Sequence, residues 1–246
     1  MKRTSLSITI LFSILILVSC KGVFRNGDII YNQERPIAKP FDCIQINDNI
    51  SVTLKEDTCQ YVEITSGKFV IDKLTAEVIG DTLVLHNNNR FDWLRSYNCP
   101  FEMIVHYKNL GIINYQSTGD LRSLDSIRGY YKNDFSVVNI NIKEGSGDID
   151  LMVSCNNVGV YYEHGTSKFI LRGKVYWSEI STHGFGPIEA ENLKSMEVYF
   201  SSTSTCYAKV WAIDLLKADL NGLGYLYYKG NPDITCNDPD KLKKIL

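Results

Sequence analysis

From Phe41 onward, apolar and polar residues alternate along the chain. The first apolar series is Ile44, Ile46, Ile50, Val52 and Leu54. The polar run Asn47-Asp48-Asn49 divides this series, so the pattern predicts a strand, a turn and a second strand. Similar alternation around residues 61–64, 82–85 and 103–107 predicts further strands, and residues 71–76 predict a short helical turn.

The second half of the chain repeats one unit, a turn of small residues followed by a strand. The third residue of each turn falls at positions 119, 147, 167, 186, 204 and 224, so the steps are 28, 20, 19, 18 and 20 residues. A period near nineteen with small residues at each corner predicts an all-β solenoid whose inward side chains form one core. An antiparallel sandwich is the alternative, but the turns of a sandwich have no reason to share a motif.

The corner residues are interpreted as structural, because glycine permits the positive φ that a sharp corner requires. Asp120 and Asp148 follow the corner glycine and are interpreted as turn residues, since the alternative of stacked acids holding Ca²⁺ fails where their column continues as Lys168 and Pro187. The predicted turn motif consists of Gly119, Asp120, Gly145, Gly147, Asp148, Gly184, Gly186, Gly222 and Gly224.

The first twenty residues have the shape of an export signal. Lys2 and Arg3 precede an apolar run that is too short to span a bilayer. The run ends in Leu17-Val18-Ser19-Cys20, which resembles the lipobox of bacterial lipoproteins and implies cleavage before an acylated Cys20. We therefore expect a signal peptide over residues 1–20, a flexible tether over 21–40, one β-domain over 41–234 and a C-terminal tail over 235–246.

Composition and charge exclude some partners and leave the cysteines open. The formal charge of −2 becomes −4 when Lys2 and Arg3 are removed with the signal, which leaves no basic footprint for nucleic acid. The 15 Tyr and 10 Phe against 4 Met favour sheet over helix. Disulfides and free thiols both remain open, and a bridge from Cys43 to Cys59 is favoured among Cys43, Cys59, Cys99, Cys155, Cys206 and Cys236.

The repeated turns carry a family resemblance. Glu144-Gly145-Ser146-Gly147-Asp148-Ile149, Ser117-Thr118-Gly119-Asp120-Leu121 and the closing Gly230-Asn231-Pro232 resemble motifs of the putative auto-transporter adhesin, head GIN domain family of bacterial lipoproteins. The likeness covers about residues 41–234 and implies a single-stranded, right-handed parallel β-helix. It brings no catalytic residues, and the turn at 202–206 departs from the pattern because it has no glycine.

Two groups of residues are candidates for binding. Glu144, His164 and His183 each precede a turn and would lie on neighbouring coils, where they would form a metal site; the alternative is an ordinary polar surface column. Aromatic residues near the C-terminus would form a binding strip for sugars or proteins, or else would cap the open end of the coil. The members of this candidate strip are Tyr207, Trp211, Tyr225 and Tyr227.

The sequence offers no nucleophile elbow, phosphate loop or dinucleotide loop, so we expect no enzyme and no cofactor. We expect a protein anchored by its N-terminal lipid in the cell envelope, at the outer membrane, on its periplasmic or its outer face. Its expected partner is a glycan or a protein, and its oligomeric state stays open. The alternatives are a glycan-binding or glycan-active accessory of a polysaccharide system and an inward-facing periplasmic scaffold.

Overall fold

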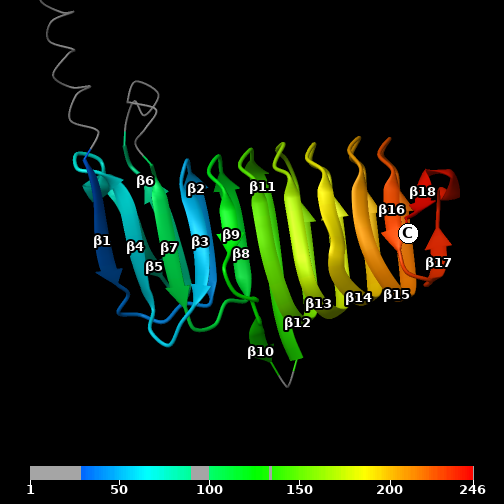
Figure 1. Cartoon of the computed structure of the whole chain (residues 1–246), viewed down its shortest axis with the longest axis horizontal. Helices are drawn as coiled ribbons and strands as arrows, with labels where there is room; N and C mark the ends of the chain where they lie inside the picture. The colour runs from blue at the N-terminus through cyan, green and yellow to red at the C-terminus, as the bar shows by residue number, and fades with distance from the viewer. Residues whose placement is uncertain (1–28, 90–99, 133–134, 246) are drawn as a thin grey trace, which may run out of the picture.

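Strands form a single continuous row along the long axis of the computed structural model (Figure 1), which describes residues 29–89, 100–132 and 135–245. These residues contain no α-helix and two short 3₁₀ turns, η1 (Ile71–Lys73) and η3 (Pro239–Lys241). The predicted all-β class is confirmed. Within these ranges no helix has the length and apolarity needed to cross a membrane.

Eighteen strands in the described ranges make up the row, and β12 to β15 are the longest. The N-terminal strands are β1 (Ile30–Pro36), β2 (Cys43–Asp48), β3 (Ser51–Glu56), β4 (Tyr61–Gly67), β5 (Leu74–Ile79), β6 (Thr82–Asn87), β7 (Glu102–Tyr107), β8 (Ile112–Ser117), β9 (Leu121–Ser123) and β10 (Tyr130–Lys132). The C-terminal strands are β11 (Phe135–Gly145), β12 (Ile149–Tyr162), β13 (Phe169–Thr182), β14 (Ile188–Ser202), β15 (Ala208–Leu220), β16 (Leu226–Lys229), β17 (Asp233–Cys236) and β18 (Leu242–Lys244).

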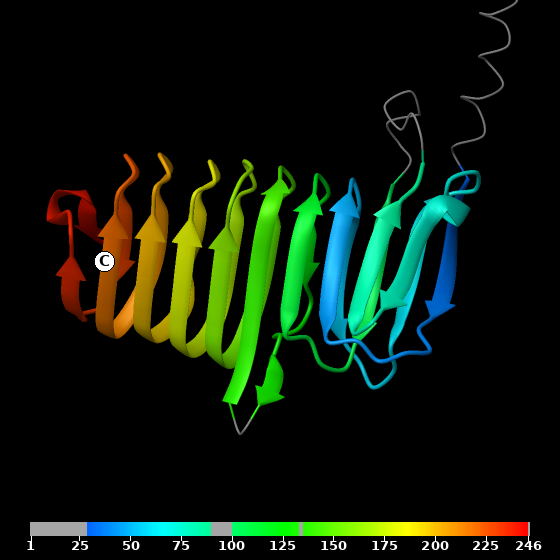
Figure 2. The ribbon, with the colours of Figure 1, turned by 180° about the vertical axis from the view of Figure 1, so that it is seen from behind.

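The long strands pass from one face of the molecule to the other. The first half of β12 pairs with β9, whereas its second half pairs with β11. We name sheet I the face formed by β1, β4, β7, β3, β9, the first halves of β12–β15, β16 and β18. Sheet II contains β5, β6, β2, β8, β11, the second halves of β12–β15, and β17. Figure 2 shows the molecule from behind.

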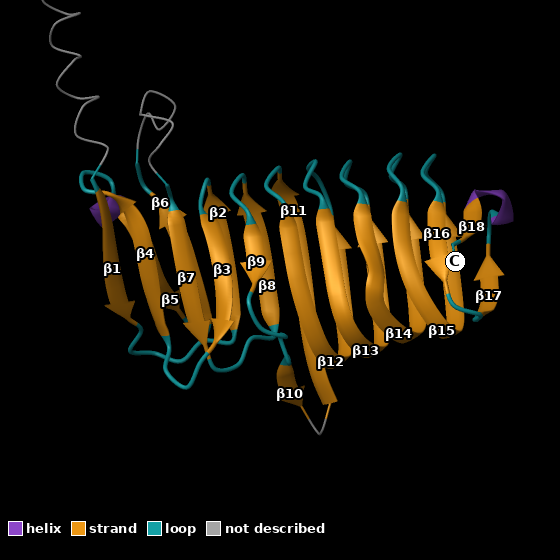
Figure 3. Ribbon diagram, in the orientation of Figure 1, coloured by secondary structure: helices purple, strands orange, loops and turns teal. Residues whose placement is uncertain are grey.

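Neighbouring long strands are parallel, and their register reproduces the sequence period. Ile149 lies beside Phe169, Phe169 beside Ile188, and Ile188 beside Ala208, so the offsets are 20, 19 and 20 residues. The turns between them line up along one edge (Figure 3). We call this edge the turn edge.

The prediction of a parallel coil throughout residues 41–234 is wrong, because the orientation of the strands is mixed. The pairs β4–β7, β5–β6 and β10–β11 are antiparallel. In β5–β6 a short connection enforces this orientation, since a parallel neighbour needs a crossover of about a dozen residues. Between β5 and β6 only Gly80 and Asp81 make the turn, and Gly80 has φ +68°.

Both expected flexible ends belong partly to the sheet. Residues 30–36, expected in the tether, form β1, which pairs with β4. The tail expected after residue 234 contributes β18, which pairs with β16. Most of β1 is exposed and therefore lacks the alternating pattern that marks a half-buried strand. These strands cover the two ends of the row and protect the edges beneath them.

The turn glycines are required for close approach between neighbouring turns rather than for positive φ. None of the seven glycines in the predicted turn motif has a positive φ. A Cβ on Gly147 would lie 2.2 Å from the carbonyl oxygen of Gly119, and one on Gly186 would lie 1.9 Å from that of Ser167. The reason given from the sequence is therefore wrong, although the need for glycine stands.

Stacking also explains Asp120 in its turn. Asp120 accepts a hydrogen bond at Oδ1 from the backbone N–H of Asp148 in the neighbouring turn, at 3.0 Å. Its Oδ2 pairs with Arg122 at 2.9 Å. Asp120 therefore links consecutive turns, a structural role of the predicted kind.

The predicted disulfide between Cys43 and Cys59 is not formed. Cys43 is buried at the start of β2, whereas Cys59 is exposed in the loop before β4, and both thiols are free. Cys155, Cys206 and Cys236 are also free. Cys99 lies outside the described residues. The core is closed by packing instead, with fully buried side chains such as Ile44, Leu54 and Phe169 from both sheets.

Candidate functional site

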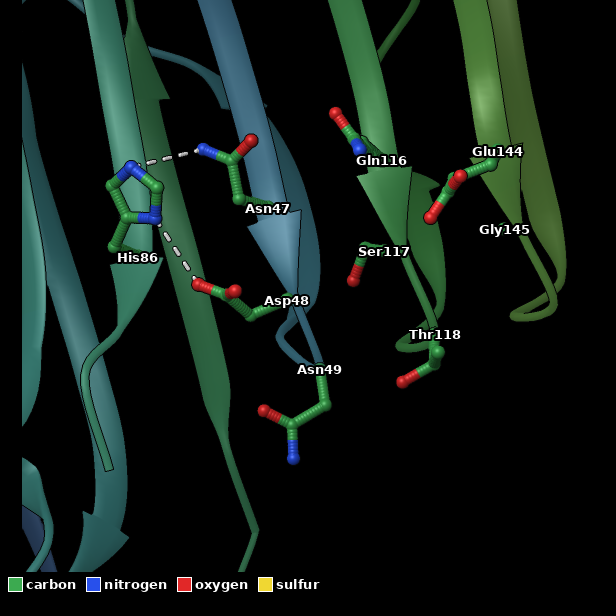
Figure 4. Close-up of a pocket in the computed structure, with 9 residues that line it drawn as sticks. All are labelled: Asn47, Asp48, Asn49, His86, Gln116, Ser117, Thr118, Glu144 and Gly145. Atoms are coloured by element: carbon green, nitrogen blue, oxygen red, sulfur yellow. Dashed lines mark hydrogen bonds and ion pairs between the residues drawn. The ribbon is translucent and has the colours of Figure 1, made fainter. Parts of the chain in front are cut away.

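A polar hollow of about 620 Å³ opens at the turn edge of sheet II. Strands β2, β6, β8 and β11 bring its wall together (Figure 4). The residues that line it are Asn47, Asp48, Asn49, His86, Gln116, Ser117, Thr118, Glu144 and Gly145. The sequence pattern predicted only a turn at residues 47–49 and gave no sign that β6 would bring His86 beside them.

Hydrogen bonds hold one wall of the hollow in place. Asp48 Oδ2 lies 3.1 Å from His86 Nδ1 and accepts the backbone N–H of Asn87 at 2.9 Å. Asn47 donates to the carbonyl oxygen of Leu85 at 3.1 Å. Asp48 has φ +64°, a conformation that Asp tolerates at a tight turn better than most residues. This geometry turns its carboxylate toward His86.

The chemistry of the hollow suits a ligand rich in hydroxyl groups. Its side chains are carboxylates, carboxamides, hydroxyls and one imidazole, which donate and accept hydrogen bonds in many directions. Asn47, Gln116 and Glu144 occupy corresponding positions on neighbouring strands, so their polar groups form a row across the hollow. Such a row matches repeated hydroxyls better than an apolar molecule.

The predicted metal trio does not come together. His164 donates its backbone N–H to the carbonyl oxygen of Lys143, which places it beside Glu144. His183 donates to the carbonyl oxygen of Tyr162, one residue earlier in the register, and its Nδ1 lies 2.7 Å from Thr203 Oγ1. Because this register is displaced by one residue, His183 does not lie beside His164 on the neighbouring strand. The described residues contain no group of three His, Cys, Asp or Glu placed to hold a metal ion.

The aromatic strip is assembled on sheet I near the C-terminal end. The rings of Tyr207 and Tyr227 pack edge to face with centroids 6.3 Å apart. Tyr225 is 47% exposed, so its ring is open to a ligand. Trp211 is half-buried, with Lys229 Nζ 4.2 Å from its ring centroid. The end of the row is covered by β17 and β18, so capping does not account for these rings.

A known protein family matches the part of the chain that contains the repeated turns and the closing Gly230-Asn231-Pro232. The family described as "Putative auto-transporter adhesin, head GIN domain" matches residues 40–232. The chain belongs to this family. No curated protein matches the chain.

Solved structures share the fold of this head GIN chain. A putative adhesin from Bacteroides fragilis is 18% identical with a TM-score of 0.74, and the match covers 89% of this chain and 94% of that one. A putative lipid binding protein from Parabacteroides distasonis is 18% identical with a TM-score of 0.62, covering 89% and 98%. A putative adhesin from Parabacteroides merdae is 15% identical with a TM-score of 0.56, covering 88% and 94%.

This head GIN chain also contains a buried histidine between two carboxylates. His106 is fully buried on the outer side of β7, and the ring of Tyr61 stacks on it with centroids 3.8 Å apart. Its Nδ1 lies 2.9 Å from Asp57 Oδ2 and its Nε2 lies 2.8 Å from Glu63 Oε1. The hydrogen bond with His106 is the largest cause that lowers the pKa of Asp57 to about 2.

The sequence gives little sign of the buried cluster. His106 is 49 residues from Asp57 and 43 from Glu63 along the chain, and each of the three stands at a position where a polar residue facing solvent is expected. Antiparallel pairing of β4 with β7 places Tyr61 opposite His106 and covers it. We interpret the cluster as a structural clamp between β7, β4 and the loop after β3.

Proposed function

We propose that this chain is a non-catalytic, lipid-anchored cell-envelope protein that presents its strands as a rigid surface for adhesion to envelope or extracellular polymers. The observation that carries the proposal is the uninterrupted row of strands in a member of an adhesin-like family. A row of this kind offers long faces on which regularly spaced contacts can add together.

The proposal includes two finer points. The first is that residues 135–229 form a right-handed, single-stranded parallel β-helix, which the parallel register with offsets of 17–20 residues supports. The second is that acylated Cys20 anchors the chain in the outer membrane; the export signal and the quartet ending in Cys20 support it. Cys20 lies outside the described residues.

A second role, glycan binding, is favoured by the hollow at the turn edge. Its row of carboxylate and carboxamide groups is complementary to sugar hydroxyls. In this role the protein would serve a surface polysaccharide system rather than attach cells to a host or to each other.

Protease accessibility tests the location on which adhesion depends. We expect an added protease to digest the chain on intact bacterial cells while a soluble periplasmic control protein stays intact. Digestion only after the outer membrane has been permeabilised would refute adhesion and favour an inward-facing scaffold. In the same cells, labelled palmitate should enter the native chain and should not enter a Cys20→Ser variant.

A further inference from the structure

The outer surface of sheet I is basic in its C-terminal half. Between β13 and β18 its outward side chains include Arg172, Lys174, Lys194, Lys209, Lys229 and Lys243, against Glu189 and Glu191. Sheet II has the opposite character over the same strands. Its outward side chains there include Glu179, Glu197, Asp219 and Asp233, against Lys217. The small net charge of the whole chain therefore conceals two faces of opposite sign.

Only part of this basic surface is neutralised within the protein. Lys209 pairs with Glu191 at 3.2 Å, and Arg172 pairs with Asp150 at 2.5 Å. In the part of the chain that the structure describes, Lys174, Lys194, Lys229 and Lys243 form no ion pair. These four ammonium groups are available to an anion from outside.

Register arranges the cations and aromatic rings in two columns, a column being the residues at one position on successive strands. The first runs Lys194, Trp211, Lys229, and Lys174 precedes it. The second runs Lys209, Tyr227, Lys243. Each column therefore places an aromatic ring between two lysines. We call these seven residues the basic-aromatic face.

The rings keep the lysines apart and stabilise their charges. Lys194 Nζ lies 5.7 Å and Lys229 Nζ 4.2 Å from the centroid of the Trp211 ring. Both are within the range of cation–π attraction, which offsets part of the repulsion between the two ammonium groups. Neighbouring strands lie about 4.8 Å apart, so the two lysines that flank the ring of a column stand about 9.6 Å apart along the row.

We propose that the basic-aromatic face binds an acidic polysaccharide whose chain runs across the strands. A chain of hexuronates carries one carboxylate per sugar, and each sugar advances the chain by about one strand spacing, so alternate carboxylates would meet the two lysines of a column. The exposed rings of Tyr207 and Tyr225 border the face and suit the apolar side of a pyranose.

This inference deepens the proposed function, on which it rests, by naming the class of polymer that the adhesive surface recognises. The test measures binding of polygalacturonate to the full-length chain in detergent by isothermal titration calorimetry. We expect binding in dilute salt that is lost in about 1 M NaCl, where screening acts within about 3 Å. Neutral dextran should not bind.

Matched variants locate the binding surface. Lys194→Gln/Lys229→Gln should weaken binding about tenfold, since each exposed ionic contact contributes up to about 1 kcal/mol. Lys143→Gln/Lys217→Gln removes the same charge from sheet II and should leave binding within about twofold of the native value. Thermal unfolding of both double variants checks that each retains its fold.

Several outcomes would overturn the inference. An equal loss in the two double variants would mean that only net charge matters, and equal binding of dextran would mean that the anion is not recognised. Stronger binding of duplex DNA or of phosphatidylglycerol vesicles would assign the face to phosphate-bearing partners instead. Digestion on intact cells together with no binding of polygalacturonate would refute this inference and leave the proposed function standing.

Discussion

Replacing Gly147 with alanine tests whether the turns stack as closely as the structure indicates. The added Cβ would lie 2.2 Å from the carbonyl oxygen and 2.4 Å from the carbonyl carbon of Gly119. Overpacking of this kind costs about 1–3 kcal/mol. Because the obstructing atoms are backbone atoms of the neighbouring turn, which cannot rotate away, we expect Gly147→Ala to cost about 3 kcal/mol.

Thermal unfolding followed by circular dichroism measures this cost. For a chain of this size, about 3 kcal/mol corresponds to a fall in Tm of about 6–12 °C. Ser146→Ala is the matched control, because Ser146 stands next to Gly147 in the same turn and is exposed. We expect that control to change stability by less than about 0.5 kcal/mol.

A second glycine separates steric obstruction from backbone strain. Gly80 has φ +68°, and a Cβ there would meet no atom within 4 Å. Gly80→Ala should therefore cost only the strain of the left-handed conformation, about 1–2 kcal/mol. The reasoning fails if Gly147→Ala unfolds at the same temperature as Ser146→Ala, or if Gly80→Ala proves the more destabilising of the two glycine variants.

Three further predictions concern individual side chains. His106→Gln should cost about 2–3 kcal/mol in urea unfolding at pH 7, less than for a fully buried pair because both carboxylates are about a quarter exposed. The pKa of Asp57 is about 2 in the folded chain against an ordinary 3.8, so its contribution to stability is complete above pH 4 and is lost as the pH falls toward 2. If the free energy of unfolding of His106→Gln depended on pH in this range as it does in the native chain, this explanation would be contradicted. Burial raises the pKa of Tyr162 to about 12 from 10, so its contribution is present below pH 10 and is lost as the pH rises through 12. Tyr162→Phe removes the hydrogen bond to the carbonyl oxygen of Ser167 and should lower the free energy of unfolding by about 1 kcal/mol at neutral pH. Its stability should also fall less steeply than that of the native chain at alkaline pH; the same pH dependence in both chains would refute the raised pKa of Tyr162. A maleimide should label Cys59 in the folded chain and Cys43 only after unfolding. If neither cysteine were labelled before or after unfolding, a disulfide between them would be indicated instead.

The sequence predicted the strands of the second half well because one local pattern controls them. In units such as Ile149 with Leu151 and Phe169 with Leu171, alternation marks the inward face, and small residues mark each corner. Side chains alternate with period two on any half-buried strand, so the pattern survives whatever lies next to it. The spacing of the corners also predicted the offset between neighbouring strands.

Strand orientation in the N-terminal part was not predictable in this way. Alternation is the same in parallel and antiparallel strands, so it gave no sign that β4 would pair with β7 in opposite directions. Connection lengths contained the missing signal at Gly80-Asp81, where two residues permit only a hairpin. The exposed strand β1 carried no alternation and was taken for a tether.

Which residues come together in the candidate sites depends on the register between neighbouring strands. A sequence pattern marks outward-facing residues alike and does not reveal that register. A displacement of one residue separates His183 from Glu144 and His164, whereas the same register sets Trp211 between Lys194 and Lys229. The sequence by itself determined the strands, their period and the small residues at the turns, because these follow from local alternation and sterics. Only the tertiary structure decided which side chains share a column and which face carries positive charge, because these depend on pairing between strands that the chain brings together from a distance.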